Sequence, residues 1–189
     1  MIAQTAVFLG LTPDTLYQAF LSPKKHGSMT LDGERPAILE RAGAPLTEHA
    51  APGDCLRALG LTGPDSDLVF VVEARILDLV AGKRIVLAWK NLGWRLALDP
   101  GKATDVASTV VLDFKANAVG AEIELVQVGV PDYEVRLPLT LEELADMPRA
   151  ERAAAHSAPG GEVGPLSALV NTHWSLVYWE PMKRYFQSR

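Results

Sequence analysis

Cysteine and long hydrophobic runs are both nearly missing from this sequence. Cys55 is the single cysteine among 189 residues, which excludes an intrachain disulfide and a metal site built from several thiolates. The longest run of purely aliphatic and aromatic residues, Leu68 to Val72, falls far short of the roughly 20 residues that a membrane-spanning helix needs. Met1 to Gln4 carries no basic leader pattern. Because a free thiol also fits a reducing compartment, we expect a cytoplasmic protein without a membrane span.

Basic charge is scarce as well. The chain has 18 lysines and arginines against 23 acidic residues, for a formal net charge of -5 and a pI near 5.4. The basic residues occur as scattered pairs, such as Lys24-Lys25 and Lys83-Arg84. Phosphate contacts dominate nucleic-acid affinity, so we expect no nucleic-acid partner. The length and the hydrophobic fraction of 48% predict one globular domain over residues 1–189.

Motifs for catalysis, cofactors and metals are lacking too. The sequence contains no dinucleotide-binding glycine pattern, no phosphate-binding loop and no nucleophile elbow. The four histidines are too dispersed for a metal-binding spacing: His26, His49, His156 and His173. We therefore predict no cofactor and no metal, and no motif assigns a catalytic residue.

The chain begins instead with clear signals for a strand and a helix. Residues 2 to 9 predict a strand. Thr12 in the N-cap position and Pro13 at the first helical position predict the start of a helix. Ser22 precedes Pro23, and the residue before proline disfavours the helical region, so the helix is predicted to end there.

Residues 37 to 130 change to strands separated by turns. The runs 68–79 and 84–89 predict one hairpin, and the runs 108–115 and 121–128 predict another. In the second hairpin the alternation places six residues on one face, namely Val110, Leu112, Phe114, Ile123, Leu125 and Gln127. Both faces of the run 85–89 are apolar, so its phase stays unassigned.

The segment from about 132 to 163 breaks the strand pattern. Thr140 to Glu143 has the form of a capping box for a short helix, and Ser157 to Gly161 is typical of a flexible linker. We predict that this insert is the most mobile part of the chain and forms a lid.

A long helix is predicted over about 165–187. Pro181 removes a backbone hydrogen bond, so a bend is expected near it. A wheel of about 100° per residue places five residues on one stripe: Leu166, Val170, His173, Trp174 and Val177. The order of strand, helix, many antiparallel strands and long helix predicts an α+β fold in which a curved antiparallel sheet grips the C-terminal helix.

These inward faces predict a ligand-binding site between the sheet and the helix. Its candidate residues are Tyr17, Phe20, Trp89, Phe114, Gln127, Val170, His173, Trp174 and Val177. Such a lining suits a small apolar or aromatic molecule, with Gln127 reading a carbonyl or hydroxyl and His173 binding it or exchanging a proton. The alternative is a packed core, in which His173 is hydrogen-bonded within the protein and Gln127 reaches solvent at the strand end.

Four segments carry a family resemblance. They are Thr12 to Pro23, Ile76 to Lys90, the strand pair that ends at Val128-Gly129-Val130-Pro131, and Tyr178-Trp179-Glu180-Pro181-Met182-Lys183-Arg184-Tyr185-Phe186. Together they resemble the helix-grip superfamily of START-type lipid-transfer and pollen-allergen-like proteins. Within it they are similar to the bacterial homologues of the activator of the heat-shock protein 90 ATPase.

The resemblance implies the helix-grip fold and leaves three functions open. The first expectation is binding of a small hydrophobic molecule, and the second is a chaperone-associated interaction module. The third is a cyclase-like or hydrolase-like enzyme that uses His173 as acid or base. The connection over 132–163 is longer than the family pattern, and no separate N-terminal chaperone-binding domain fits the sequence, which weakens the second expectation.

Overall fold

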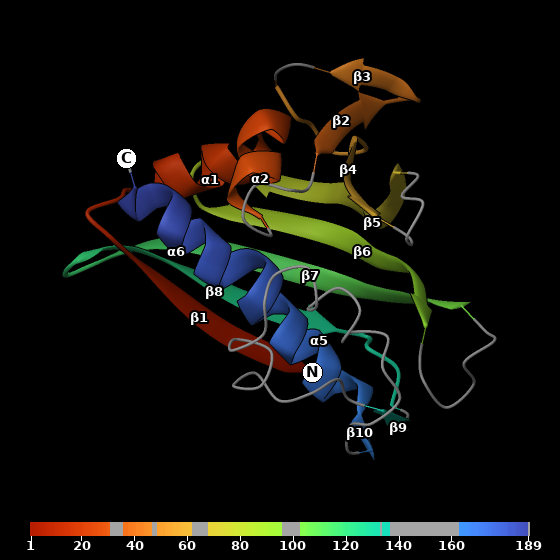
Figure 1. Ribbon diagram of the computed structural model, residues 1–189. Coiled ribbons are helices and arrows are strands. Elements are labelled where there is room, and N and C mark those ends of the chain that lie inside the picture. The colour runs from red at the N-terminus through yellow and green to blue at the C-terminus, as the bar shows by residue number, and fades with distance from the viewer. Residues whose placement is uncertain are drawn as a thin grey trace.

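The computed structural model shows an α+β fold built on a curved antiparallel sheet of eight strands, with a long C-terminal helix across its concave face (Figure 1). The structure describes residues 1–30, 36–46, 49–61, 68–95, 103–132, 134–136 and 163–188. The strand order is β1-β8-β7-β6-β5-β4-β2-β3, and a second sheet pairs β9 with β10. The predicted fold class, a curved sheet that grips the C-terminal helix, is confirmed.

The strands occupy most of the first two thirds of the chain. Their bounds are β1 Ile2–Leu9, β2 Ala37–Arg41, β3 Ala44–Leu46, β4 Cys55–Leu61, β5 Leu68–Val80, β6 Arg84–Arg95, β7 Ala103–Asn117, β8 Gly120–Val128, β9 Glu134–Arg136 and β10 Val163–Pro165. The two hairpins predicted from the sequence are β5–β6 and β7–β8, with antiparallel pairing in both. None of the described helices combines the length and the apolarity needed to cross a membrane.

Two short helices follow β1. The first, α1 (Pro13–Leu21), begins as predicted, because the Thr12 hydroxyl accepts the backbone N–H of Thr15 and Pro13 needs no partner. Ser22 ends this helix and also caps a second one, α2 (Pro23–Met29), by accepting the backbone N–H of Lys25. The end of α1 at Ser22 is as predicted, but α2 was not predicted, since Pro23 is compatible with a helix start as well as with a helix stop.

The C-terminal helix is one continuous run with an unexpected middle. It consists of α5 (Leu166–His173), a π-helical segment η2 (Trp174–Trp179) and α6 (Glu180–Gln187). The long helix predicted over about 165–187 is confirmed, but a wheel of constant pitch did not predict the π-helical turn. Within η2 the backbone N–H of Glu180 donates to the carbonyl of Ser175, five residues back. Pro181 follows at once and has no N–H to offer the carbonyl of Val177, so the α pattern is interrupted at this turn.

The alternation predicted for β7 and β8 is confirmed. Val110, Leu112 and Phe114 are buried on the concave face, and so are the facing residues of β8, Ile123, Leu125 and Gln127. Glu122 and Glu124 lie on the opposite face, where Glu124 pairs with Lys115. In β6 the inward residues are Ile85, Leu87, Trp89 and Asn91. The structure thus shows which residues of the run 85–89 face inward, which the sequence pattern did not decide.

The predicted insert at 132–163 is tied at its base by the second sheet. Glu134–Arg136 pairs antiparallel with Val163–Pro165, directly before α5. The capping box predicted at Thr140 to Glu143, the linker at Ser157 to Gly161 and the predicted lid movement lie outside the described residues.

Candidate binding site beneath the C-terminal helix

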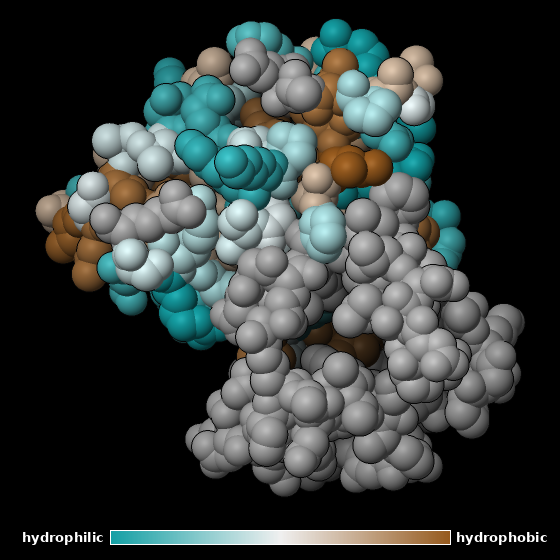
Figure 2. Space-filling model, turned by 45° about the horizontal axis from the view of Figure 1, so that its top comes forward, coloured by the Kyte–Doolittle hydropathy of each residue, from teal (hydrophilic) through white to brown (hydrophobic). Residues whose placement is uncertain are grey.

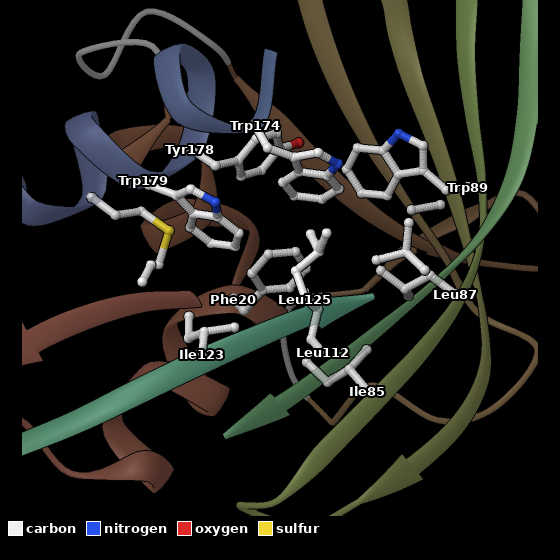
Figure 3. Packing of buried hydrophobic residues seen from close by; sticks show 14 of the residues in the cluster. Phe20, Ile85, Leu87, Trp89, Leu112, Ile123, Leu125, Trp174, Tyr178 and Trp179 are labelled. Carbon is white, nitrogen blue, oxygen red and sulfur yellow. The ribbon is translucent and has the colours of Figure 1, made fainter. Parts of the chain in front are cut away.

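A row of aromatic rings fills the space where the helix crosses the sheet (Figure 3). Trp174 lies between Trp89 of β6 and Tyr178, with ring centroids 4.9 Å and 4.6 Å away. Tyr178 also stacks with Phe20 of α1 at 6.2 Å. All four rings are almost completely buried. The row joins the helix, the sheet and α1 into one hydrophobic core.

The π-helical turn explains why so many of these rings face the sheet. Trp174 and Trp179 stack with 5.4 Å between centroids and 19° between ring planes. In an α-helix, positions five apart diverge by about 140° around the axis, so both indoles could not face one core. The wider turn of η2 brings Trp174, Tyr178 and Trp179 to the same side, as Figure 3 shows.

Each buried indole N–H of this row donates to an amide side chain of the concave face. Trp174 donates to Gln127 over 2.7 Å, and Trp89 donates to Asn91 over 3.0 Å. Trp179 donates to Gln4 of β1. A buried tryptophan needs such an acceptor, because an unmet N–H in an apolar core is costly.

Two of these amides continue into longer networks. Gln127 donates to the Ser108 hydroxyl over 2.7 Å, and this bond links β8 to β7. Gln4 donates to the backbone carbonyl of Asn171 and to its side-chain oxygen, at 2.8 Å and 2.7 Å. Gln127 therefore points inward as predicted and does not reach solvent, but its polar atoms are engaged by Trp174 and Ser108.

Asn91 differs from the other two amides. Its oxygen accepts from Trp89, but its amide nitrogen has no hydrogen-bond partner among the described residues, and the residue is 1% exposed. Its neighbours across the sheet are Val72 of β5 and Val106 of β7, both buried and apolar. In the described part of the concave face, the Asn91 amide N–H is thus a buried donor without an acceptor, framed by aliphatic side chains and the indole of Trp89.

Two histidines border the row of rings. His173 is half-buried, with its ring 6.5 Å from that of Tyr178. His26 of α2 is buried, and its Nδ1 lies 2.8 Å from the carbonyl of Phe20, so this nitrogen carries the proton and donates. His26 also contacts Tyr178 edge to face at 5.6 Å.

The structure separates the nine predicted site residues into groups. Phe20, Trp89, Gln127 and Trp174 meet around Tyr178, with His173 at the margin. Tyr17 and Phe114 form a separate edge-to-face pair at 5.6 Å, and burial together with Asp14 and Asp78 raises the pKa of the Tyr17 phenol. Val170 and Val177 are buried on the helix.

Sequence reasoning left five residues out of the proposed site, namely Gln4, His26, Asn91, Tyr178 and Trp179. Gln4 was detectable, because it alternates with the apolar residues Ile2, Ala6 and Phe8. Trp179 was not detectable by a wheel of constant pitch, since only the π-helical turn brings it inward.

Two hollows among the described residues lie beside β1 rather than beneath Trp174. One, of about 270 Å³, is lined by Gln4, Thr5 and Ala6 together with the helix residues Ser175, Trp179, Glu180 and Lys183. The other, of about 220 Å³, is lined by Ala3, Gln4 and Thr5 of β1 and by Glu124, Leu125 and Val126 of β8.

The described residues offer no group of three or more His, Cys, Asp or Glu side chains that could hold a metal ion. Cys55 is buried at the start of β4, and burial raises the pKa of its thiol. A thiol in this environment reacts slowly, because the thiolate is the nucleophilic form.

Comparison with known proteins supports the fold. No protein-family profile matches the chain, and no curated protein matches it. Among solved structures, ChR145 from Cytophaga hutchinsonii superposes with a TM-score of 0.51 at 10% identity, covering 100% of this chain and 95% of that chain. MLL2253 from Mesorhizobium loti gives a TM-score of 0.50 at 12% identity, covering 99% and 96%. These similarities show a shared fold over nearly the whole chain.

Proposed function

We propose that this protein binds a small apolar or aromatic molecule on the concave face of its sheet, beside Trp89 and Asn91. The resemblance to START-type helix-grip proteins, and to the bacterial homologues of the heat-shock protein 90 ATPase activator, supports binding between sheet and helix. The observation that carries the proposal is the buried amide nitrogen of Asn91, which has no partner among the described residues.

The energy of an unmet donor is the physical argument. A buried N–H without an acceptor costs about 1 to 3 kcal/mol, and buried polar groups in folded proteins are almost always satisfied. Gln4 and Gln127 on the same face both donate to protein acceptors. A ligand carbonyl or hydroxyl beside Asn91 would accept its N–H and recover this energy, while the rest of the ligand packs against Val72, Val106 and the indole of Trp89.

Charge favours an uncharged ligand. Among the described residues, the buried polar set is His26, Thr30, Asp54, Asn91 and Gln127. Asp54 directly precedes β4, and its charge is paired with Arg41. Burying a charged ligand without a partner of opposite sign is costly, so the amides and hydroxyls of this face match a neutral molecule.

A matched pair of ligands tests the proposal without changing the protein. Fluorene and fluorenone have the same ring system and differ by one carbonyl group. We expect fluorenone to bind with a micromolar dissociation constant, about -8 kcal/mol, and roughly tenfold more tightly than fluorene, a difference of about 1.4 kcal/mol. Asn91→Asp keeps the acceptor for Trp89 and removes the donor, so it should abolish the preference. Asn171→Asp, an exposed change of the same kind, should leave it intact.

The alternative function is the chaperone-associated interaction module, and one observation favours it. The rings from Trp89 to Trp179 are in mutual contact, so this part of the core is occupied by protein. If neither fluorene nor fluorenone binds, the ligand proposal fails and the interaction module takes its place. Equal binding of the two compounds would contradict the role given to Asn91.

A further inference from the structure

The two edges of the large sheet differ sharply in how they are protected. One edge is β3, which has three residues and contains Pro45. The other edge is β1, which has eight residues, Ile-Ala-Gln-Thr-Ala-Val-Phe-Leu, with no charge, no proline and no glycine. Natural sheets protect exposed edges by shortness, proline, charge or bulges. The β3 edge follows this rule, and β1 does not.

Exposed apolar side chains gather at the β1 edge. Among the described residues, six of the large hydrophobic side chains that are exposed lie on or beside β1: Met1, Val7, Leu9, Val119, Val126 and Val128. Met1 is 87% and Leu9 is 68% exposed. The hydrophobic group at the left of Figure 2 lies over the end of the sheet where β1 leads toward α1. An apolar concentration of this kind on a surface marks an interaction site.

The centre of β1 is open on two sides. The hollow of about 270 Å³ touches three consecutive residues, Gln4 to Ala6, whose side chains alternate between the two faces, so it lies along the free edge of the strand. The hollow of about 220 Å³ reaches Thr5 from the side of β8. No other described strand pairs with this edge.

We propose that a second copy of this chain occupies the edge, pairing β1 with β1 in antiparallel fashion about a twofold axis at Thr5. Directly opposed residues of an antiparallel pair point to the same face, so a register centred on Thr5 keeps every side chain on its own face. The outer face then opposes Thr5 to Thr5, Ala3 to Val7 and Met1 to Leu9.

The strand is complementary to itself in this register. It is uncharged, so pairing brings no like charges together, and Thr–Thr and aliphatic cross-strand pairs are favourable. On the inner face Ile2 opposes Phe8. At the rim of the hollow of about 270 Å³, Glu180 and Lys183 pair with each other within one copy, so this rim brings no net charge to the contact. A strand from an unrelated protein would have to match all of these features.

Charge substitutions at Thr5 test both the contact and the register. Sedimentation velocity and light scattering should find the wild-type chain dimeric at micromolar concentrations. Thr5→Lys and Thr5→Glu each place two like charges opposite one another and should halve the mass. An equimolar mixture of the two variants should restore a dimer, because lysine then faces glutamate. Leu77→Lys, an exposed change on β5, is the matched control and should stay dimeric.

Three outcomes would overturn the proposal. A wild-type monomer would leave the edge to a strand of another protein. A dimer that survives both Thr5 substitutions would lie at another surface. Monomeric variants that do not recombine on mixing would exclude a twofold axis at Thr5. Melting curves of the variants confirm that they are folded, and Thr5 is exposed, so both charges can remain in water. The outcome is independent of ligand binding.

Discussion

The indole nitrogen of Trp174 donates a hydrogen bond of 2.7 Å to the amide oxygen of Gln127, and both residues are completely buried. This bond joins the C-terminal helix to β8. Gln127 passes the connection on to Ser108 of β7. The contact between the sheet and the helix is therefore polar as well as hydrophobic. Because a hydrogen bond is directional, it restricts the rotation of the helix about its axis.

Gln127→Leu should lower the free energy of unfolding by about 1 to 3 kcal/mol, because the Trp174 N–H would stay buried without an acceptor. Trp174→Phe removes that N–H, so the double variant should lose less than the sum of the two single variants. Urea unfolding of the four proteins measures this coupling. Val126→Leu, on the exposed face of the same strand, is the control. If the stability losses of the two single variants simply added up in the double variant, the hydrogen bond between Trp174 and Gln127 would be contradicted.

Deletion of Ser175 should convert the π-helical turn into an α-helical one, because a π-turn holds one residue more than an α-turn. Trp174 and Trp179 would then lie four positions apart, about 40° around the axis of an α-helix. Trp179 should therefore keep its bond to Gln4, and Met182 should stay buried. Insertion of one alanine after Ser175 would instead rotate α6 by about 100° relative to α5, cost about 3 to 5 kcal/mol and weaken the near-ultraviolet circular dichroism signal from the stacked indoles. Equal stability losses for the deletion and the insertion, measured by urea unfolding, would contradict this role of η2.

Gly120→Ala should destabilise the fold by about 2 to 4 kcal/mol. Gly120 has φ +154°, and a Cβ there would lie 2.3 Å from the carbonyl oxygen of Phe8 and 2.6 Å from the nitrogen of Gly10. The close approach arises where the end of β1 pairs with the start of β8. Gly43→Ala is the matched control: its φ is +83°, but no atom lies within 4 Å, so only about 1 kcal/mol is expected. Equal melting temperatures of the Gly120→Ala and Gly43→Ala variants would contradict the close approach of Gly120 to Phe8 and Gly10.

Asp54→Asn should change how stability depends on acid. Arg41 holds both carboxylate oxygens of Asp54, at 2.8 Å and 2.9 Å, and this pair lowers the pKa of Asp54 below its ordinary value of 3.8. As the pH falls, the Asp54 carboxylate is protonated in the unfolded chain before it is protonated in the folded chain. The ion pair therefore stabilises the fold fully above the ordinary pKa of 3.8, and this stabilisation is lost as the pH falls through the lower pKa of the folded state.

Urea unfolding from pH 7 down to pH values below the folded-state pKa of Asp54 measures this effect. The variant should be less stable than the wild type at neutral pH, and the difference should shrink as acid is added. Asp132→Asn, at an exposed position, should keep the full wild-type response. If the difference in unfolding free energy between the wild type and Asp54→Asn did not change with pH, the ion pair between Arg41 and Asp54 would contribute nothing to stability.

Much of the fold was predictable because its signals are local. The alternation of Val110, Leu112 and Phe114 required one buried face, and Thr12 with Pro13 marked a helix start by capping chemistry alone. The π-helical turn was not predictable, because periodicity analysis assumes one pitch. Pro181 indicated an irregularity, but the helix absorbs it in the turn before the proline.

The candidate site was predictable only in part, because pairings between distant elements set it. The rings of Phe20, Trp89 and Trp174 were each expected on an inward face, yet their contact through Tyr178 depends on where α1 and the helix meet the sheet. Asn91 stayed unnoticed because Val86 and Ala88 made both faces of β6 look apolar. The curved sheet keeps these two residues half-buried on its convex side.

The small β9–β10 ladder has an evolutionary consequence. Because Arg136 pairs with Val163, the chain between them leaves and returns at one point, just before the helix begins. The entropy of closing such a loop rises only with the logarithm of its length, so a doubling costs about 0.6 kcal/mol. The loop-closure entropy therefore lets the length of the connection between Arg136 and Val163 vary among descendants while the packing of the C-terminal helix on the large sheet stays unchanged.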